Sequence, residues 1–268
     1  MSHHRRWKYA LTACALAIAT AAGATSAAAT TRHDDSPKPT IVLVHGAFAD
    51  GSSWNGVVGG LQALGYPVVV VANPLRDLNG DAAYLSSVLA AISGPVILVG
   101  HSYGGEVITD GAAGDPNVKA LVYIAAFAPD QGESGAAILG RFPGSKLPAA
   151  LIVRPYPGGA EAYLDPAQFR AVFAADLPPA ITDIMAADQR PVGLAALQTP
   201  SGPPAWKTLP SWYLVAGADQ AIPPAAEEFM AQRAHAHTEE VPGASHAVLI
   251  SHPDRVIELI EEAADAAG

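Results

Sequence analysis

The chain has 268 residues, of which 50% are hydrophobic and 15% are charged. That is enough for one sizeable core but too little for two ordinary domains and a linker. Fifteen Lys and Arg against 25 Asp and Glu leave a net charge of −10, the wrong sign for a phosphate-binding surface, which argues against a nucleic-acid partner. The single cysteine, Cys14, excludes a disulfide framework and a cysteine-ligated zinc site.

The first 29 residues have the layout of a secretory signal peptide. A basic start over Met1–Tyr9 is followed by an apolar run to about Ala22 and by small residues over Thr25–Ala29, where cleavage sites of the A-x-A type occur. A membrane anchor is the alternative, but the run is rich in Ala, Thr and Gly and therefore only weakly hydrophobic. We predict a signal peptide over residues 1–29, secretion, and no stable membrane association after cleavage.

Two details of this leader leave the export route open. The pair Arg5-Arg6 points toward twin-arginine export, although its neighbours match that motif poorly, and Leu11–Cys14 resembles a lipoprotein box. Cleavage after residue 29 would remove three basic residues and the cysteine, which leaves a mature chain of net charge −13 without a thiol. The Asp-, Ser- and Pro-containing stretch over residues 30–39 is expected to be a flexible lead-in.

From Thr40 onward, short apolar runs alternate with helix-length segments, a pattern typical of a parallel sheet covered on both faces. The expected strands are Ile41–Val44, Val68–Val71, Val96–Val99, Ala120–Ala125, Trp212–Ala216 and Thr238–Val241. The expected helices are Trp54–Leu64, Asp81–Ile92, Tyr103–Ala112, Pro224–Arg233 and Pro253–Ala264. The alternation predicts one α/β domain over residues 30–268, a doubly wound, mostly parallel sheet with ligands at the carboxyl ends of its strands.

One interval, Pro129–Leu209, breaks this rhythm. It is rich in Pro, Gly and Ala, contains no convincing strand, and is too long for a bare loop in a compact domain. Helical pieces over Pro166–Ala175 and Pro179–Ala187 predict a mostly helical cap, inserted before the strand that precedes Asp219.

A serine motif follows the third expected strand. Gly100-His101-Ser102-Tyr103-Gly104 lies directly after the strand over Pro95–Val99 and directly before a helix, the strand-turn-helix setting of a G-x-S-x-G nucleophile elbow. The glycines let neighbouring segments pass close to the strained turn. We interpret Ser102 as a nucleophile rather than as a helix cap.

A serine nucleophile needs a base, and the base needs an orienting carboxylate. In this architecture the order along the chain is serine, acid, histidine. Asp219 follows the strand over Trp212–Ala216, and His246 follows the last strand, so both are expected at the same sheet edge as Ser102. Asp130, after the fourth strand, is the rival acid because its loop opens on the same edge.

The other histidines are weaker candidates for the base. His235 and His237 lie at a polar junction where solvation is expected, and His252 introduces the last helix. His101 is adjacent to Ser102 along the chain, which points its side chain away from the attacking oxygen.

Acyl transfer also needs donors aimed at the developing oxyanion. The backbone N–H of Tyr103, which follows the nucleophile, is one candidate. The N–H of Ala47, in the loop His45-Gly46-Ala47-Phe48 after the first strand, is the other; a tight turn without a catalytic role is the alternative for this loop.

Together, His45-Gly46-Ala47-Phe48 with the downstream Trp54, the elbow, Gly217-Ala218-Asp219 and Ser245-His246 resemble the α/β-hydrolase superfamily over Thr40–Gly268. Within it, the H-G-A loop with a downstream Trp, the short count of strands and the helical cap resemble the small capped esterases and hydroxynitrile lyases related to plant methyl esterases. The resemblance implies a cofactor-free serine hydrolase that acts on small apolar esters. Ala247 stands where the lyases carry a lysine, which argues against cyanohydrin cleavage, and Ser102 argues against dehalogenase and epoxide hydrolase relatives, which use an aspartate nucleophile.

Phe48, Trp54 and Phe127 on the loops, with Met185 in the cap, are the candidate substrate-binding residues, although cap side chains also suit the cap's own core. No metal-ligand spacing or phosphate loop is found in the sequence, so no cofactor is predicted. The expected function is a secreted serine esterase for a small apolar ester. A perhydrolase-type haloperoxidase, a lactonase, a C–C bond hydrolase and a non-catalytic ligand-binding protein remain alternatives.

Overall fold

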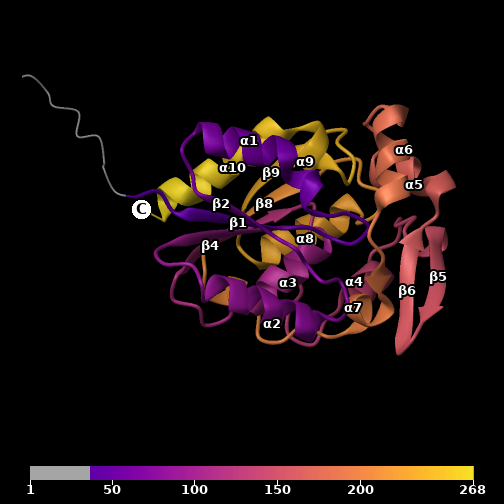
Figure 1. Cartoon of the computed structure of the whole chain (residues 1–268), viewed down its shortest axis with the longest axis horizontal. Coiled ribbons are helices and arrows are strands. Elements are labelled where there is room, and N and C mark those ends of the chain that lie inside the picture. The colour runs from indigo at the N-terminus through magenta and orange to yellow at the C-terminus, as the bar shows by residue number, and fades with distance from the viewer. Residues whose placement is uncertain (1–36, 268) are drawn as a thin grey trace, which may run out of the picture. The chain divides into compact units, whose positions relative to one another are not determined.

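Six parallel strands form the central sheet of the structure, a computed structural model that describes residues 37–267 (Figure 1). The predicted signal peptide and Cys14 lie outside the described residues. In the sheet order β2-β1-β3-β4-β8-β9, every neighbouring pair is parallel, which confirms the predicted fold class. The strands are β1 (Thr40–Val44), β2 (Val68–Val71), β3 (Val96–His101), β4 (Val118–Ile124), β8 (Ser211–Ala216) and β9 (His237–Val241).

Helices cover both faces of this sheet because its strands carry apolar side chains on both faces. Ile41 and Leu43 of β1 belong to one core, and the alternating Val42 and Val44 belong to the other. In Figure 1, α1, α9 and α10 lie above the sheet, and α2 and α3 lie below it. The bounds are η1 (Gly51–Trp54), α1 (Asn55–Ala63), α2 (Leu78–Leu89), α3 (Tyr103–Gly111), α8 (Pro224–Arg233), α9 (Val248–Ser251) and α10 (Pro253–Ala266).

The cap between β4 and β8 contains both predicted helices, but it also contains strands. A three-stranded antiparallel sheet of order β5-β6-β7 stands beside four short α-helices, so this interval contains strands although none is convincing in its sequence. The cap elements are α4 (Gly135–Arg141), η2 (Pro148–Ala150), β5 (Leu151–Tyr156), β6 (Gly159–Leu164), α5 (Pro166–Phe173), α6 (Pro179–Asp188), β7 (Val192–Gly193), α7 (Leu194–Gln198) and η3 (Ala205–Lys207).

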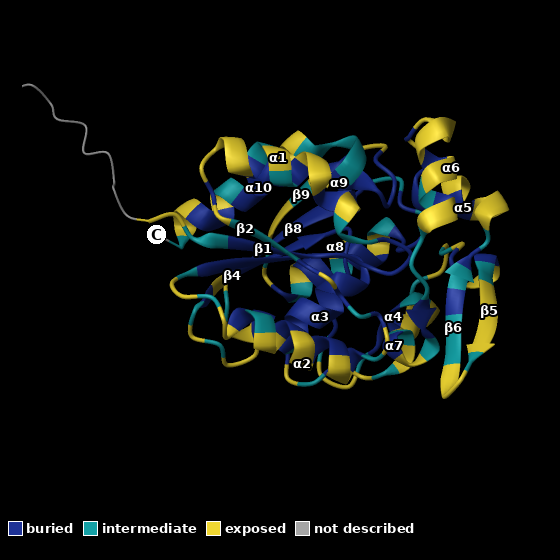
Figure 2. Ribbon diagram, in the orientation of Figure 1, coloured by how far each residue is buried: buried dark blue, intermediate teal, exposed yellow. Residues whose placement is uncertain are grey.

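The cap hairpin lacks the usual signals of a strand. β5 exposes most of its length, and Pro155 cannot donate to a neighbouring strand, so neither a buried run nor a clean alternation marks it (Figure 2). Its turn is made at Gly158, whose φ of +95° is left-handed and therefore suits glycine. Pairing of Leu151 with Leu164 and of Tyr156 with Gly159 closes the hairpin.

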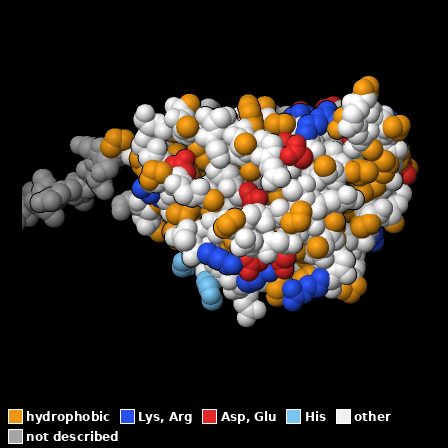
Figure 3. Space-filling model, turned by 90° about the horizontal axis from the view of Figure 1, so that it is seen from below, with side chains coloured by type: hydrophobic (Ala, Val, Ile, Leu, Met, Phe, Trp, Pro, Cys, Tyr) orange, Lys and Arg blue, Asp and Glu red, His pale blue; other side chains and the backbone are white. Residues whose placement is uncertain are grey.

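Exposed apolar side chains concentrate on the cap. Ile152 and Val153 of β5 and Ile181 and Ile184 of α6 are among the large hydrophobic residues on the surface. Figure 3 shows hydrophobic side chains gathered over one end of the molecule. Within residues 37–267, no helix combines the length and the apolar character needed to cross a bilayer.

Candidate active site

The strand β3 delivers Ser102 to a sharp turn at the edge of the sheet. Ser102 has φ +55° and ψ −124°, a strained conformation for a residue with a side chain, and α3 begins at the next residue. Small neighbours permit the turn: a Cβ at Gly46 would lie 2.6 Å from the Cβ of Ser102, and one at Gly104 would lie 2.4 Å from the carbonyl oxygen of Val44. The geometry is that of a nucleophile elbow.

Asp219 and His246 lie on the loops that follow β8 and β9, and both meet Ser102. His246 Nε2 is 2.8 Å from Ser102 Oγ, and His246 Nδ1 is 2.5 Å from Asp219 Oδ2. The other carboxylate oxygen, Oδ1, accepts the N–H groups of Ala221 at 2.6 Å and Ile222 at 2.9 Å. All three side chains are buried, with Ser102 the most open at 6%. The structure therefore brings the three predicted catalytic residues together.

The rival candidates lie elsewhere. Asp130 forms an ion pair with Lys207 at the surface. His235 and His237 are exposed, and His252 precedes α10, as expected. None of these four side chains hydrogen-bonds to Ser102, Asp219 or His246 within the described part of the chain.

His101 has a contact that the sequence does not reveal. Its side chain is fully buried, and its Nε2–H donates to the backbone carbonyl of His246 at 3.0 Å. The two rings lie 4.8 Å apart. Burial, and then the proximity of His246, lower the pKa of His101 well below its usual value, so this ring is neutral beside the candidate base.

The candidate oxyanion donors are both free to bind a ligand. Among residues 37–267, the N–H groups of Ala47 and Tyr103 have no acceptor, whereas the N–H of Phe48 is used by the carbonyl of Arg190 at 3.1 Å. Ala47 follows Gly46, which packs on Ser102, and Tyr103 follows Ser102 directly. The structure thus offers two unpaired donors next to the serine and excludes Phe48 as the donor in its loop.

A second carboxyl group is buried behind Asp219. Glu227 of α8 is inaccessible to solvent, and its Oε2 accepts the N–H of Ala216 at 3.0 Å. Burial, and then the neighbouring carboxylate of Asp219, raise the pKa of Glu227 well above its ordinary value. Glu227 therefore keeps its proton at pH values where a solvated glutamate is ionised.

Replacing Glu227 by Gln should remove a pH dependence of stability. Above the unfolded-state pKa of about 4.3 and up to the raised native pKa, the folded protein holds one proton more than the unfolded chain. The free energy of unfolding of the wild type should therefore fall with rising pH in this window, by at most about 1.4 kcal/mol per pH unit. Glutamine cannot ionise and keeps an acceptor for Ala216.

Urea denaturation of both proteins across this window measures the difference, with Glu228→Gln as the control because Glu228 is the exposed neighbour on α8. The control should follow the wild type. Parallel stability curves for wild type and Glu227→Gln would contradict the proposed protonation.

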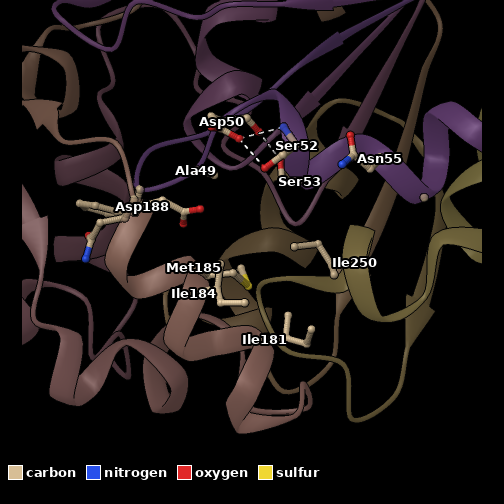
Figure 4. Close-up of a pocket in the computed structure, with 13 residues that line it drawn as sticks. Ala49, Asp50, Ser52, Ser53, Asn55, Ile181, Ile184, Met185, Asp188 and Ile250 are labelled. Atoms are coloured by element: carbon tan, nitrogen blue, oxygen red, sulfur yellow. Dashed lines mark hydrogen bonds between the residues drawn. The ribbon is translucent and has the colours of Figure 1, made fainter.

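Two pockets share residues with the loops around the site, although neither is lined by Ser102, Asp219 or His246 themselves. The first, of about 250 Å³, lies between the loop after β1 and helix α6, and Phe48 and Met185 line it together with Ile181, Ile184 and Ile250 (Figure 4). Asp50, Ser52 and Asn55 line its polar side. The second, of about 320 Å³, is apolar and is lined by Phe127, by Gly135, Ala136, Leu139 and Gly140 of α4, by Leu147, Pro148 and Leu151, and by Leu194, Leu197 and Gln198 of α7.

Three of the four predicted pocket residues, Phe48, Met185 and Phe127, line these pockets. Phe48 is next to Ala47 in the chain, and the N–H of Phe127 donates to the Ser102 carbonyl at 3.1 Å. Trp54 lines neither of these pockets: it is fully buried in the core and packs edge-on against His101 at 6.3 Å. Trp54 is therefore a core residue.

Comparison with known proteins identifies the family of the chain. Residues 41–259 match the model of the alpha/beta hydrolase family. The chain is 29% identical over 252 residues to the alpha/beta hydrolase nvfD of Aspergillus novofumigatus, which covers 86% of this chain and 98% of that protein. It is 31% identical over 259 residues to the pyrethroid hydrolase of Sphingobium wenxiniae, with 84% and 88% covered.

The crystal structure of polyneuridine aldehyde esterase superposes with a TM-score of 0.73 at 19% identity, covering 84% of this chain and 98% of that one. At this identity the likeness concerns the fold. The match to the family model extends from β1 into α10 and so includes Ser102, Asp219 and His246. The chain belongs to the alpha/beta hydrolase family and is a carboxylesterase-like serine hydrolase.

Proposed function

We propose that this protein hydrolyses small apolar carboxylic esters with Ser102 as nucleophile, His246 as base and Asp219 as the orienting acid. The observation that carries the proposal is the continuous contact from Ser102 Oγ through His246 to Asp219, at 2.8 and 2.5 Å, on a strained elbow. A hydroxyl placed in this way can lose its proton as it attacks a carbonyl carbon.

The reaction follows from the positions of the donors and acceptors. Ser102 Oγ adds to the ester carbonyl while His246 Nε2 takes the hydroxyl proton, and the N–H groups of Ala47 and Tyr103 bind the oxyanion. Collapse of the tetrahedral intermediate breaks the bond to the leaving oxygen, which receives the proton from His246. Water then attacks the acyl-serine with His246 as base, the bond between the acyl carbon and Ser102 Oγ breaks, Ser102 takes the proton back from His246, and the carboxylic acid leaves.

The substrate class is supported by the pockets and by a relative. Both pockets are lined largely by apolar side chains, as expected for an apolar acyl or alcohol group. The Sphingobium wenxiniae relative is named a pyrethroid hydrolase. Within residues 37–267, no group of three or more His, Cys, Asp or Glu residues could hold a metal ion, and the proposed steps use only side chains, backbone N–H groups and water. Export with removal of residues 1–29 is part of the same proposal and rests on the sequence layout of that segment.

The test is hydrolysis of p-nitrophenyl esters of increasing acyl length by residues 30–268, with Ser102→Ala as control. We expect turnover that depends on Ser102, peaks at short acyl chains, and is accompanied by labelling of Ser102 with an organophosphate. The variant should remain folded, because the hydroxyl is a small part of a buried site. Ester turnover by Ser102→Ala at the wild-type rate would refute the proposal.

The alternative reactions appear as distinct outcomes of the same test. If Ser102 is labelled but no ester is hydrolysed, assays with lactone, peracid-forming and diketone substrates distinguish a lactonase, a perhydrolase and a C–C bond hydrolase. A protein that is stabilised by ligands but is neither labelled nor active would be a binding protein.

A further inference from the structure

Hydrogen bonds fix the backbone of the loop that carries His246. The carbonyl of Ala244 accepts the N–H of Ala218, in the loop of Asp219, at 2.9 Å. The carbonyl of His246 accepts Nε2–H of His101, next to Ser102, at 3.0 Å. The loop is therefore tied to the acid and to the nucleophile through its backbone.

The remaining two residues of this loop are held by the cap. Ser245 donates its backbone N–H to Asp176 Oδ2 at 3.1 Å, and its hydroxyl donates to Asp176 Oδ1. Ala247 donates its N–H to the carbonyl of Phe173, the last residue of α5, at 2.9 Å. The cap segment over residues 173–176 thus binds the residue before His246 and the residue after it.

The same segment also contacts the imidazole itself. The ring of Phe173 meets the ring of His246 edge-on, with centroids 4.8 Å apart, and it meets His101 in the same manner at 6.1 Å. The three rings therefore form one cluster, in which His246 contacts both the aromatic ring of the cap and the ring of His101. Because a side chain that packs against two neighbouring rings has fewer rotamers available, the cap restricts the orientation of His246 as well as its position.

The carboxylate of Asp176 is used by its contact with Ser245. Its side chain is only 18% exposed, and both of its oxygens accept donors of Ser245. Partial burial opposes its charge, but the hydrogen bonds from Ser245, and then from Ser251, lower the pKa of Asp176. Its nearest ion-pair partner in the described residues is His252, at 3.9 Å, whose ring nitrogen also contacts the hydroxyl of Ser251.

We propose that Asp176 is a positioning residue, through which the cap holds His246 in register with Ser102 and Asp219. The inference rests on the proposed function, because it assigns His246 the role of base. It gives the cap a part in building the catalytic machinery in addition to lining the pockets. A displacement of residues 173–176 would loosen Ser245, Ala247 and the contact with Phe173 together.

The experiment compares Asp176→Ala, Asp176→Asn, Ser245→Ala and the double variant Asp176→Ala/Ser245→Ala. The control is Asp183→Ala, which removes an exposed cap carboxylate from α6. For each we measure kcat and KM on the best ester, the rate of organophosphate labelling of Ser102, and Tm. The labelling rate depends on the Ser102–His246 pair without requiring a good ester substrate.

We expect Asp176→Ala and Ser245→Ala each to lower kcat and the labelling rate by about 10- to 100-fold, with little change in KM, because small misplacement of a base is costly. The double variant should be no slower than the slower single variant, since both changes break one contact. Asp176→Asn keeps one acceptor oxygen and should recover part of the rate. Asp183→Ala should match the wild type.

Three results would overturn the inference. One is wild-type kcat and labelling in Asp176→Ala and Ser245→Ala. Another is a double variant in which the fold-losses in kcat of the two single variants multiply. The third is a lower Tm in all of the Asp176 and Ser245 variants with no change in kcat or in the labelling rate. If Asp176→Ala does not fold, Asp176→Asn and Ser245→Ala still decide the question. Failure of the proposed function is a separate result, seen as an unlabelled and inactive wild type.

Discussion

Replacing Asp219 by Asn should lower kcat by about 10⁴-fold while the fold remains intact. Asp219 Oδ1 accepts two backbone N–H groups, from Ala221 and Ile222, and Oδ2 faces His246 Nδ1. An asparagine has one oxygen, and the two backbone donors require it. Its NH₂ group must then face Nδ1 and donate to it, so the imidazole carries its proton on Nε2, the nitrogen that faces Ser102. In that tautomer the ring has no lone pair with which to accept the serine proton.

Steady-state kinetics of Asp219→Asn on the best ester, with circular dichroism to confirm folding, measures this loss. The matched control is Asp130→Asn, which removes the rival acid and breaks a surface ion pair with Lys207. Such a pair contributes at most about 1 kcal/mol, so the control should keep its activity and nearly all of its stability. A large loss in Asp130→Asn together with an active Asp219→Asn would reverse the assignment.

Replacing Gly104 by Ala should destabilise the protein by about 3 kcal/mol and remove most of its activity. The added Cβ would lie 2.4 Å from the carbonyl oxygen of Val44 and 3.0 Å from that of His45. These contacts involve backbone, which cannot rotate away, at the point where α3 crosses the end of β1. Relief requires movement of the loop that carries Ala47.

For Gly59→Ala, the same chemical change, we expect the opposite effect on stability. Gly59 lies in α1 on an exposed face, and a Cβ there would meet nothing within 4 Å. Because alanine favours a helix more than glycine does, this variant should gain up to about 1 kcal/mol. Urea denaturation of both variants and the wild type tests the pair. Equal effects of the two substitutions would show that the packing at Gly104 is looser than the structure indicates.

The parts of the fold that the sequence predicted are those with strong local signals. Continuous apolar runs such as Val96–Val99 are buried on both faces and could be read directly as central strands. Ser102 and Asp219 each follow such a strand, His246 follows the polar edge strand β9, and parallel strands place their carboxyl ends at one edge. The site could be inferred from motifs because the order of strands in the sheet brings the loops of these three residues together.

The features that were missed depend on distant segments. Trp54 was assigned to the pocket because it lies in a loop region at the catalytic edge, but its ring turns into the core. The contact of Asp176 with Ser245 spans 69 residues, and neither residue belongs to a recognisable motif. The hydrogen bond of His101 goes to the carbonyl of His246, 145 residues further along the chain. Local patterns carry no information about such pairings.

The insertion of the cap between two neighbouring strands has a consequence for the order of folding. Strands β2, β1, β3 and β4 come from one continuous stretch, residues 40–124, and this stretch already contains the elbow of Ser102. Strand β8 pairs with β4 only after the chain closes a loop over the entire cap, which adds to the entropic cost of that pairing. During synthesis the four strands of the sheet that surround Ser102 have therefore all emerged before the segments that carry Asp219 and His246. A nascent chain can therefore have Ser102 in its turn while the contacts with His246 and Asp219 wait until its last fifth has docked.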